Sequence, residues 1–199
     1  MRAELAGIIR RRIPLVSIAT TMMSLALGVM ACQIDLGGPL PPGPPIVVSQ
    51  EASAQVQQNW QSALEAAATT GSVTVLLTES QVTSFLSQRL AASEEAVLDN
   101  PQVYLRDGAI EVFGGARQGP IRANVHVSIS PRIDDQGALG FEITSANFGP
   151  IPAPDFITDS VSTILSEAFT GTLGSLATGI RITTIAIADG ELAVVGELR

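Results

Sequence analysis

Residues 121–130 read IRANVHVSIS, and this stretch decides the fold. Its odd positions are apolar, and its even positions carry polar or charged side chains. Because successive side chains of a strand point to opposite faces, the alternation predicts a strand with one buried and one wet face. Such a strand is typical of an antiparallel sheet that is covered on one side only.

Turn signals separate this strand from its neighbours. Asp-Gly pairs at 107–108 and 189–190 are strong hairpin signals, and Gly119-Pro120 and the DDQG stretch at 134–137 also reverse the chain. Gly114-Gly115, and a slip in the apolar phase between Ile182 and Ile185, predict β-bulges. The short apolar runs between these signals predict further strands at 73–77, 103–106, 110–113, 139–143, 180–188 and 191–198.

Three segments have the composition and period of helices. Residues 49–68 are rich in alanine, glutamine and glutamate, with an apolar stripe at Val56, Trp60, Leu64 and Ala67. Thr78 and Gln81 have capping-box spacing at the start of a second helix that we expect to end near residue 92. A third, amphipathic helix is predicted over 156–177, with Asp155 as its N-cap after the proline loop GPIPAP.

These elements predict an α+β fold in which a curved, mostly antiparallel sheet packs on amphipathic helices. We expect the folded domain to span residues 49–199. A domain of this length buries enough surface to fold alone.

The residues before the domain read as an export signal. Arg10, Arg11 and Arg12 precede an uncharged apolar run over 13–31, which predicts a signal peptide at 1–31. The run ends in Val29-Met30-Ala31-Cys32, which resembles the lipobox of bacterial lipoproteins. That resemblance implies acylation of the Cys32 sulfur, the only cysteine, and cleavage before it, so that the chain is lipid-anchored on the extracytoplasmic face of a bacterial membrane.

Two alternatives to the lipoprotein remain open. The apolar run has 19 residues, near the ~20 that span a bilayer, so it also fits an uncleaved transmembrane anchor. An ordinary cleaved signal, followed by an incidental cysteine, is the other alternative. All three place the domain in the cell envelope or beyond it, outside the cytoplasm.

A proline- and glycine-rich segment follows the cysteine. Five prolines and three glycines lie between Gly37 and Pro45, which favours extended polyproline II structure. We therefore expect residues 32–48 to be a tether that holds the domain off the membrane, with a disordered connector as the alternative.

Composition excludes some functions. The chain has 11 basic residues, all arginine, and 19 acidic ones, and a net charge of −8. From Cys32 onward, seven arginines face 18 acids, a balance of −11. Such a region is acidic overall, whereas nucleic-acid binding depends mainly on neutralising phosphates, so we expect no nucleic-acid partner.

The sequence holds no recognisable catalytic or metal motif. His126, the only histidine, lies on the polar side of its strand, where we expect it to be solvated. Asp134-Asp135 reads as a turn pair, and Glu94-Glu95 with Asp99 does not match the spacing of a calcium loop. We therefore expect a non-enzymatic protein without metal or cofactor.

A family resemblance suggests what the domain binds. LTESQVTSFLSQRL (77–90), RDGAIEVFGG (106–115), the IPAPDF loop (151–156) and IADGELAVVG (187–196) resemble exported phospholipid-binding domains of the LmeA and YpmS type. Those families are similar to tubular lipid-binding proteins, in which a curved sheet wraps a helix around an apolar channel. The resemblance covers roughly residues 73–199 and implies that the domain binds a phospholipid or related amphiphile.

The resulting hypothesis is a membrane-anchored lipoprotein with an apolar slot between sheet and helix. The alternative is a cell-surface scaffold or interaction module in which the same side chains close into a dry core. Candidate lining residues are Phe85, Phe141, Phe148, Phe156, Ile164, Leu165, Phe169 and Leu173.

Overall fold

The computed structural model describes residues 33–92, 98–166 and 179–198, with only the backbone for 164–166. The chain divides into two units, Met1–Ile34 and Asp35–Arg199. A two-residue strand, β1 (Ile34–Asp35), lies at this boundary. All that follows concerns the second unit.

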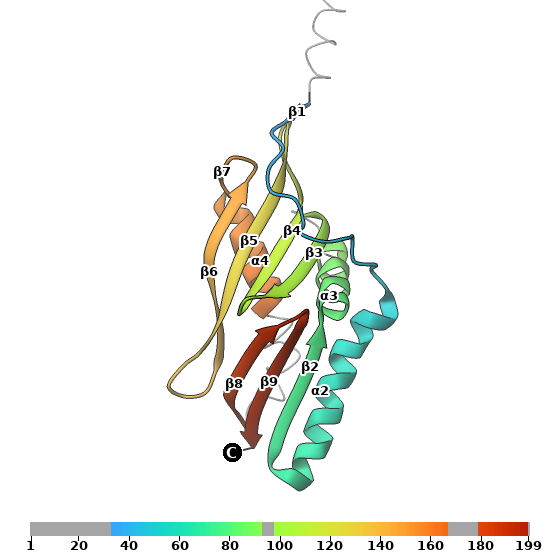
Figure 1. Cartoon of the computed structure of the whole chain (residues 1–199), viewed down its shortest axis with the longest axis vertical. Coiled ribbons are helices and arrows are strands. Elements are labelled where there is room, and N and C mark those ends of the chain that lie inside the picture. The colour runs from blue at the N-terminus through green and yellow to red at the C-terminus, as the bar shows by residue number, and fades with distance from the viewer. Residues whose placement is uncertain (1–32, 93–97, 167–178, 199) are drawn as a thin grey trace, which may run out of the picture. The chain divides into compact units, whose positions relative to one another are not determined.

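The larger sheet, sheet A, contains the strand that opened the sequence analysis. Its strands lie in the order β3–β4–β5–β6–β7, and every neighbouring pair is antiparallel (Figure 1). The predicted turns at Asp107-Gly108, Gly119-Pro120 and 134–137 all join neighbouring strands of this sheet. The strands are β3 (Asp99–Arg106), β4 (Ala109–Gln118), β5 (Ile121–Ile133), β6 (Leu139–Phe148) and β7 (Ile151–Pro152).

The remaining strands form a second sheet, sheet B, where the sequence led us to expect one continuous sheet. Sheet B has the order β2–β9–β8, again antiparallel, from β2 (Ser72–Thr78), β8 (Ile180–Ala188) and β9 (Glu191–Leu198). The two sheets meet at their Asp-Gly turns. Gly190 N–H donates to Leu105 O (3.0 Å), and Gly108 N–H donates to Ile187 O (3.2 Å). The α+β class with antiparallel sheets is thus confirmed, but with a seam between two sheets.

The first two helices begin and end where their capping residues predict. In α2 (Gln50–Thr70), the Ser49 side chain caps the start by accepting from Ala52 N–H, and Gly71 ends the helix with a φ of 74°. In α3 (Glu79–Ala92), the predicted capping box forms. Thr78 N–H donates to Gln81 Oε1 (3.0 Å), and Gln81 N–H donates to Thr78 Oγ1 (3.3 Å).

The third helix, α4 (Asp155–Ser166), is described only in part. The helix starts one position earlier than predicted, because Asp155, expected as the N-cap, is already its first helical residue. The continuation predicted to residue 177 lies outside the described residues.

The helices and sheets close on one apolar core. α2 packs against α3 and β2, α3 against β3, and α4 against β6. Val125, Val127 and Ile129 of β5 are at most 1% exposed, as the alternation predicted. The buried stripe of α2 differs by one position from the predicted stripe, because Ala63 is buried where Leu64 was expected, and Leu64 is only partly buried.

One predicted bulge is confirmed, and one was assigned to the wrong strand. The register of β8 shifts between Ile182 and Thr184, as the slip in apolar phase predicted. Opposite Gly114-Gly115, however, the extra residue lies in β3, between Asp99 and Gln102. Gly114 serves another purpose: a Cβ there would lie 2.7 Å from Leu98 Cγ, so the glycine makes room for that side chain.

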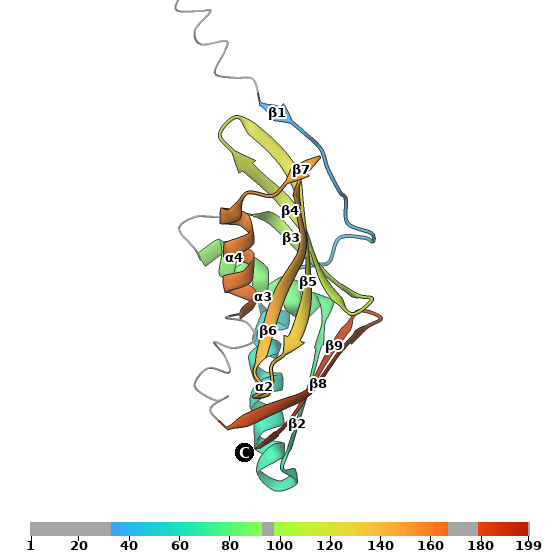
Figure 2. The same ribbon diagram turned by 90° about the vertical axis from the view of Figure 1, so that its left-hand side faces the viewer.

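The proline-rich segment is bound to the domain instead of projecting from it. Residues 36–48, here called the strap, cross the face of sheet A opposite α4 (Figures 1 and 2). Leu36 N–H donates to Arg122 O (2.9 Å), and Asn124 N–H donates to Gly37 O (2.8 Å). Gln102 accepts from Ile46 N–H (2.5 Å) and donates to Ile46 O (3.4 Å). Because prolines lack an N–H, the strap is held mainly through its carbonyls, by donors on the sheet.

Candidate functional site

The apolar face of the β5–β6 hairpin, which carries the candidates Phe141 and Phe148, is here called the candidate ligand face. Pro131 faces Phe141 across the two strands, and Ile129 faces Ile143. The register then shifts by one residue, so Ala146 and Phe148 continue the same apolar face opposite Val127 and Val125. The candidates Phe141 and Phe148 therefore share one face of β6, which the sequence pattern beyond residue 143 did not reveal.

Burial changes along this apolar face. Phe148, at one end, is 1% exposed and belongs to the closed core. Toward the 134–137 turn the side chains Leu139, Phe141 and Ile143 are only partly buried, and Ile133 is 37% exposed. The face is thus sealed at the Phe148 end and incompletely covered at the turn end.

Helix α4 packs on the strand that carries this face. Its Ile157 and Val161 are fully buried, whereas the candidate Phe156 is 39% exposed. The structure describes only the backbone of Ile164 and Leu165. Phe169 and Leu173 lie outside the described residues.

The remaining aromatic candidate with a described side chain lies on α3. Phe85 is partly buried against the core, and the Arg89 guanidinium carbon lies 5.3 Å from its ring centroid. Phe85 therefore has a cationic neighbour that the sequence analysis did not anticipate.

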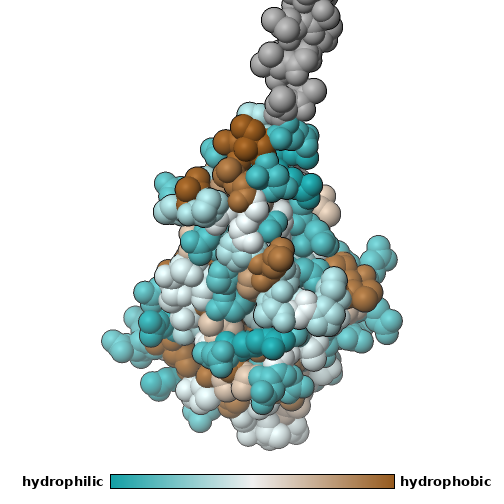
Figure 3. All heavy atoms as spheres, turned by 45° about the horizontal axis from the view of Figure 1, so that its top comes forward, coloured by the Kyte–Doolittle hydropathy of each residue, from teal (hydrophilic) through white to brown (hydrophobic). Residues whose placement is uncertain are grey.

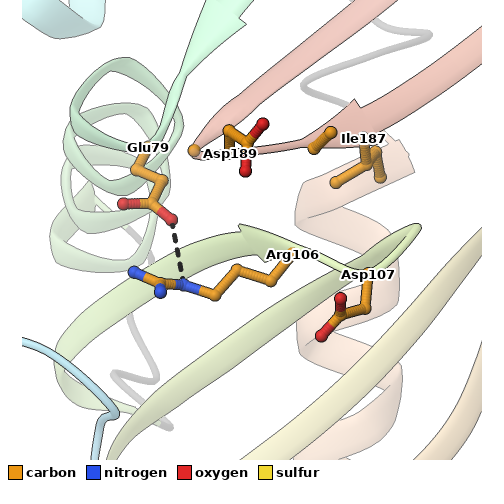
Figure 4. Close-up of a pocket in the computed structure, with 7 residues that line it drawn as sticks. Glu79, Arg106, Asp107, Ile187 and Asp189 are labelled. Carbon is orange, nitrogen blue, oxygen red and sulfur yellow. Dashed lines mark ion pairs between the residues drawn. The ribbon is translucent and has the colours of Figure 1, made fainter.

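A polar pocket of about 550 Å³ lies at the seam between the sheets (Figure 4). None of the four candidates whose side chains the structure describes lines it. Its described lining consists of Glu79, Arg106, Asp107, Ile187, Ala188, Asp189 and Gly190. Glu79 Oε1 accepts from Leu105 N–H (2.9 Å) and lies 3.7 Å from Arg106 Nε. Glu79 N–H also donates to Gly190 O (3.1 Å). One residue of α3 thus binds both sheets, and we assign the pocket a structural role at the seam.

We expect Glu79→Ala to lower the free energy of unfolding by about 1–3 kcal/mol, because the N–H of Leu105 loses its acceptor. Glu79→Gln is the matched control, since its side-chain carbonyl can still accept this bond and it removes only the ion pair with Arg106, a half-exposed side chain. Urea unfolding measures both variants. Equal losses in the two variants would contradict the assigned hydrogen bond.

The face of sheet A that the strap crosses carries a polar cluster around His126. Its Nε2 contacts Glu111 Oε2, and Ser128 Oγ donates to Glu111 Oε1 (2.7 Å). His126 also stacks on Phe113, with ring centroids 4.5 Å apart. The expectation of a solvated histidine was wrong, because the side chain is only 21% exposed and is paired. Glu111 separates the serine from the histidine, so this is not the arrangement in which histidine activates a serine.

Tyr104 holds the middle of the strap. Its hydroxyl lies 3.3 Å from Gly43 O and 3.1 Å from Pro44 O, and it can donate its one proton to either carbonyl. The residue is 1% exposed. Burial, and secondarily the negative charge of Glu79, raise the pKa of Tyr104 above 10.0, while Arg106 acts in the opposite direction.

This shift predicts a loss of stability in alkali. Because the folded state raises the Tyr104 pKa, its contribution is complete below the unfolded value of about 10 and disappears as pH rises through the folded value. The phenolate cannot donate to the strap. We therefore expect the unfolding free energy to fall above about pH 10 more steeply in the wild type than in Tyr104→Phe. Parallel pH profiles would contradict this.

The acidic positions considered for metal binding have other roles or remain untested. Asp134 accepts from Gln136 N–H (2.8 Å) and Ala138 N–H (2.7 Å), which confirms its interpretation as a turn residue. Glu94 and Glu95 lie outside the described residues. Within the described ranges, no three His, Cys, Asp or Glu side chains are grouped for a metal ion, and no helix is long and apolar enough to cross a membrane.

No protein-family model matches the chain. A search of curated proteins also finds no match.

Proposed function

We propose that this protein is an extracytoplasmic lipoprotein, anchored through Cys32, that binds a phospholipid or similar amphiphile along the apolar face of the β5–β6 hairpin. The observation that supports this best is the incomplete burial of Leu139, Phe141 and Ile143, and the exposure of Ile133, on the face against which α4 packs. An acyl chain laid on this face would cover apolar surface at about 25 cal/mol per Å². No catalytic step belongs to the proposal.

Mass spectrometry of co-purified lipid tests the binding. A soluble form that begins at Gln33 retains the whole strap, and we expect it to carry lipid after purification without detergent. Phe141→Asp places a charge on the proposed face and should abolish retention. Ser145→Asp is the matched control, because Ser145 is exposed on the opposite face of the same strand, and it should retain lipid. Wild-type protein that neither retains nor takes up lipid would reject the proposal.

The second candidate function is a tethered scaffold or interaction module. It is favoured by the closed part of the core, where Phe148, Ile157 and Val161 are at most 1% exposed. For this candidate, the wild type and both variants would be equally free of lipid.

A further inference from the structure

The strap fixes where the chain enters the domain. Its first hydrogen bonds are to Arg122 and Asn124, at the start of β5 beside the Gly119-Pro120 turn. Gly38 lies against Gly149: a Cβ at Gly38 would be 2.7 Å from Gly149 Cα, and its φ is 125°. The strap, the start of β5 and the loop before β7 therefore meet at one end of sheet A.

The docked strap leaves little free chain between this end and Cys32. Four residue steps separate Cys32 from Leu36, which span at most about 14 Å. A free spacer that reached Ser49 would have extended about 50 Å. Both the lipid anchor and an uncleaved span over 13–31 place the bilayer immediately before these residues, so either would hold this end of the sheet close to it.

Exposed apolar side chains lie at this end. Leu40 is 73% exposed, two residues after Gly38. Ile151 is 48% exposed, two residues after Gly149, and Phe156 in the first turn of α4 is 39% exposed. Figure 3, with the top of Figure 1 turned forward, shows separate apolar groups among polar ones around the place where the described chain begins.

Two arginines add positive charge here. Arg117 and Arg122 are exposed and lie directly opposite each other on β4 and β5. Like charges in this position repel, so their pairing is unfavourable unless an anion lies nearby. Within the described residues, neither forms an ion pair. They are two of the seven arginines in a region with 18 acids, and Asp99 lines the same pocket as Arg122 and Leu40.

We propose that this end of the domain docks directly on an anionic bilayer, with Leu40, Ile151 and Phe156 in the headgroup layer and Arg117 and Arg122 against lipid phosphates. The proposal rests on the membrane attachment put forward above. Three apolar side chains bind a bilayer weakly by themselves, but attachment through a short chain raises their effective concentration at the surface. β5 runs away from this end for 13 residues, about 40 Å. Docking therefore directs the incompletely covered ligand face away from the bilayer.

The test uses the lipidated protein in vesicles of phosphatidylethanolamine and phosphatidylglycerol. Acylation consumes the Cys32 thiol, so a second cysteine can be labelled alone with an environment-sensitive fluorophore. We expect Leu40→Cys and Ile151→Cys labels to be quenched severalfold more strongly by spin-labelled lipid than two controls. The controls are Val47→Cys, which is 80% exposed on the strap but beyond the docked end, and Thr70→Cys at the end of α2. In vesicles of phosphatidylcholine alone, the difference should shrink.

Each result bears on the proposal separately from the proposed function. Equal quenching at positions 40, 151, 47 and 70 would overturn the docked orientation, even if the protein is acylated and retains lipid. Strong quenching at Val47→Cys would also overturn it, because the strap would then lie flat on the bilayer. A label at position 151 that is already shielded in unlipidated Cys32→Ser protein without vesicles would indicate a protein contact and reject docking. Absence of acylation would instead count against the anchoring in the proposed function.

Discussion

Cys32→Ser is expected to abolish acylation of the protein. A hydroxyl cannot replace the thiol in thioether acylation. Each buried CH₂ of an acyl chain contributes about 0.8 kcal/mol of membrane affinity, so two chains make attachment effectively permanent. Their loss exceeds any effect of a single side chain in the domain. Labelling of cells with a radioactive fatty acid, followed by immunoprecipitation of the domain, measures the change.

Labelling of the wild type separates the three interpretations of the N-terminus. Gln33→Ser, next to the modified residue, is the control and should still be labelled. If residues 13–31 form an uncleaved span, the wild type is not labelled and stays in the membrane fraction, and the lipoprotein prediction is rejected. If the segment is an ordinary cleaved signal, the wild type is not labelled and is already soluble.

Trp60→Ala is expected to cost about 3–5 kcal/mol of unfolding free energy. Trp60 is completely buried on the core side of α2, and truncation leaves a cavity the size of an indole. Domains of this kind are stabilised by about 5–15 kcal/mol, so the variant should unfold well below the wild-type urea midpoint. Circular dichroism is the appropriate measurement, because Trp60 is the only tryptophan.

Trp60→Phe is the informative control. The indole Nε1 is buried and has no hydrogen-bond partner in the described part of the chain. Phenylalanine removes this unsatisfied donor while it keeps an aromatic ring, so we expect a loss of only about 1–2 kcal/mol. If Trp60→Phe is as damaging as Trp60→Ala, then an unseen partner of the indole N–H contributes to stability.

Local signals in the sequence predicted most elements of the fold. The alternation over 121–130, the two Asp-Gly turns and the Thr78–Gln81 capping box each act within a few residues, and each is present in the structure. These features depend on backbone preferences that a short window contains. The antiparallel arrangement follows from the turns, because a tight turn reverses the chain and places the next strand beside the previous one.

Long-range features were not predictable in the same way. The seam between the sheets depends on Glu79, which reads locally as a first-turn helix residue but binds Leu105, 26 positions away. The strap was read as a spacer because its prolines preclude helix and central strand, and nothing in its own residues indicates Tyr104 or Gln102. Likewise, the pairing of His126 with Glu111 depends on the register of two strands, which periodicity alone does not give.

The candidate ligand face was predicted in part. Phe141 and Phe148 share a face as required, but only because a register shift in β6 corrects the phase between them. Phe156 and Phe85 occupy other surroundings, and half of the candidates lie outside the described side chains. Which apolar side chains remain uncovered depends on the packing of α4, and therefore on tertiary structure.

The bound strap has a consequence for the resistance of the chain to proteases. Proteases cleave segments that can leave the domain surface and adopt an extended conformation, and exposed linkers are their usual targets. Here the linker is rich in proline and is hydrogen-bonded to sheet A at Leu36, Gly37 and Ile46. Release of the domain by nicking would require cleavage in the few residues before Leu36 or prior detachment of the strap. If the proposed anchor at Cys32 is present, the fold thereby protects the domain against release from the membrane.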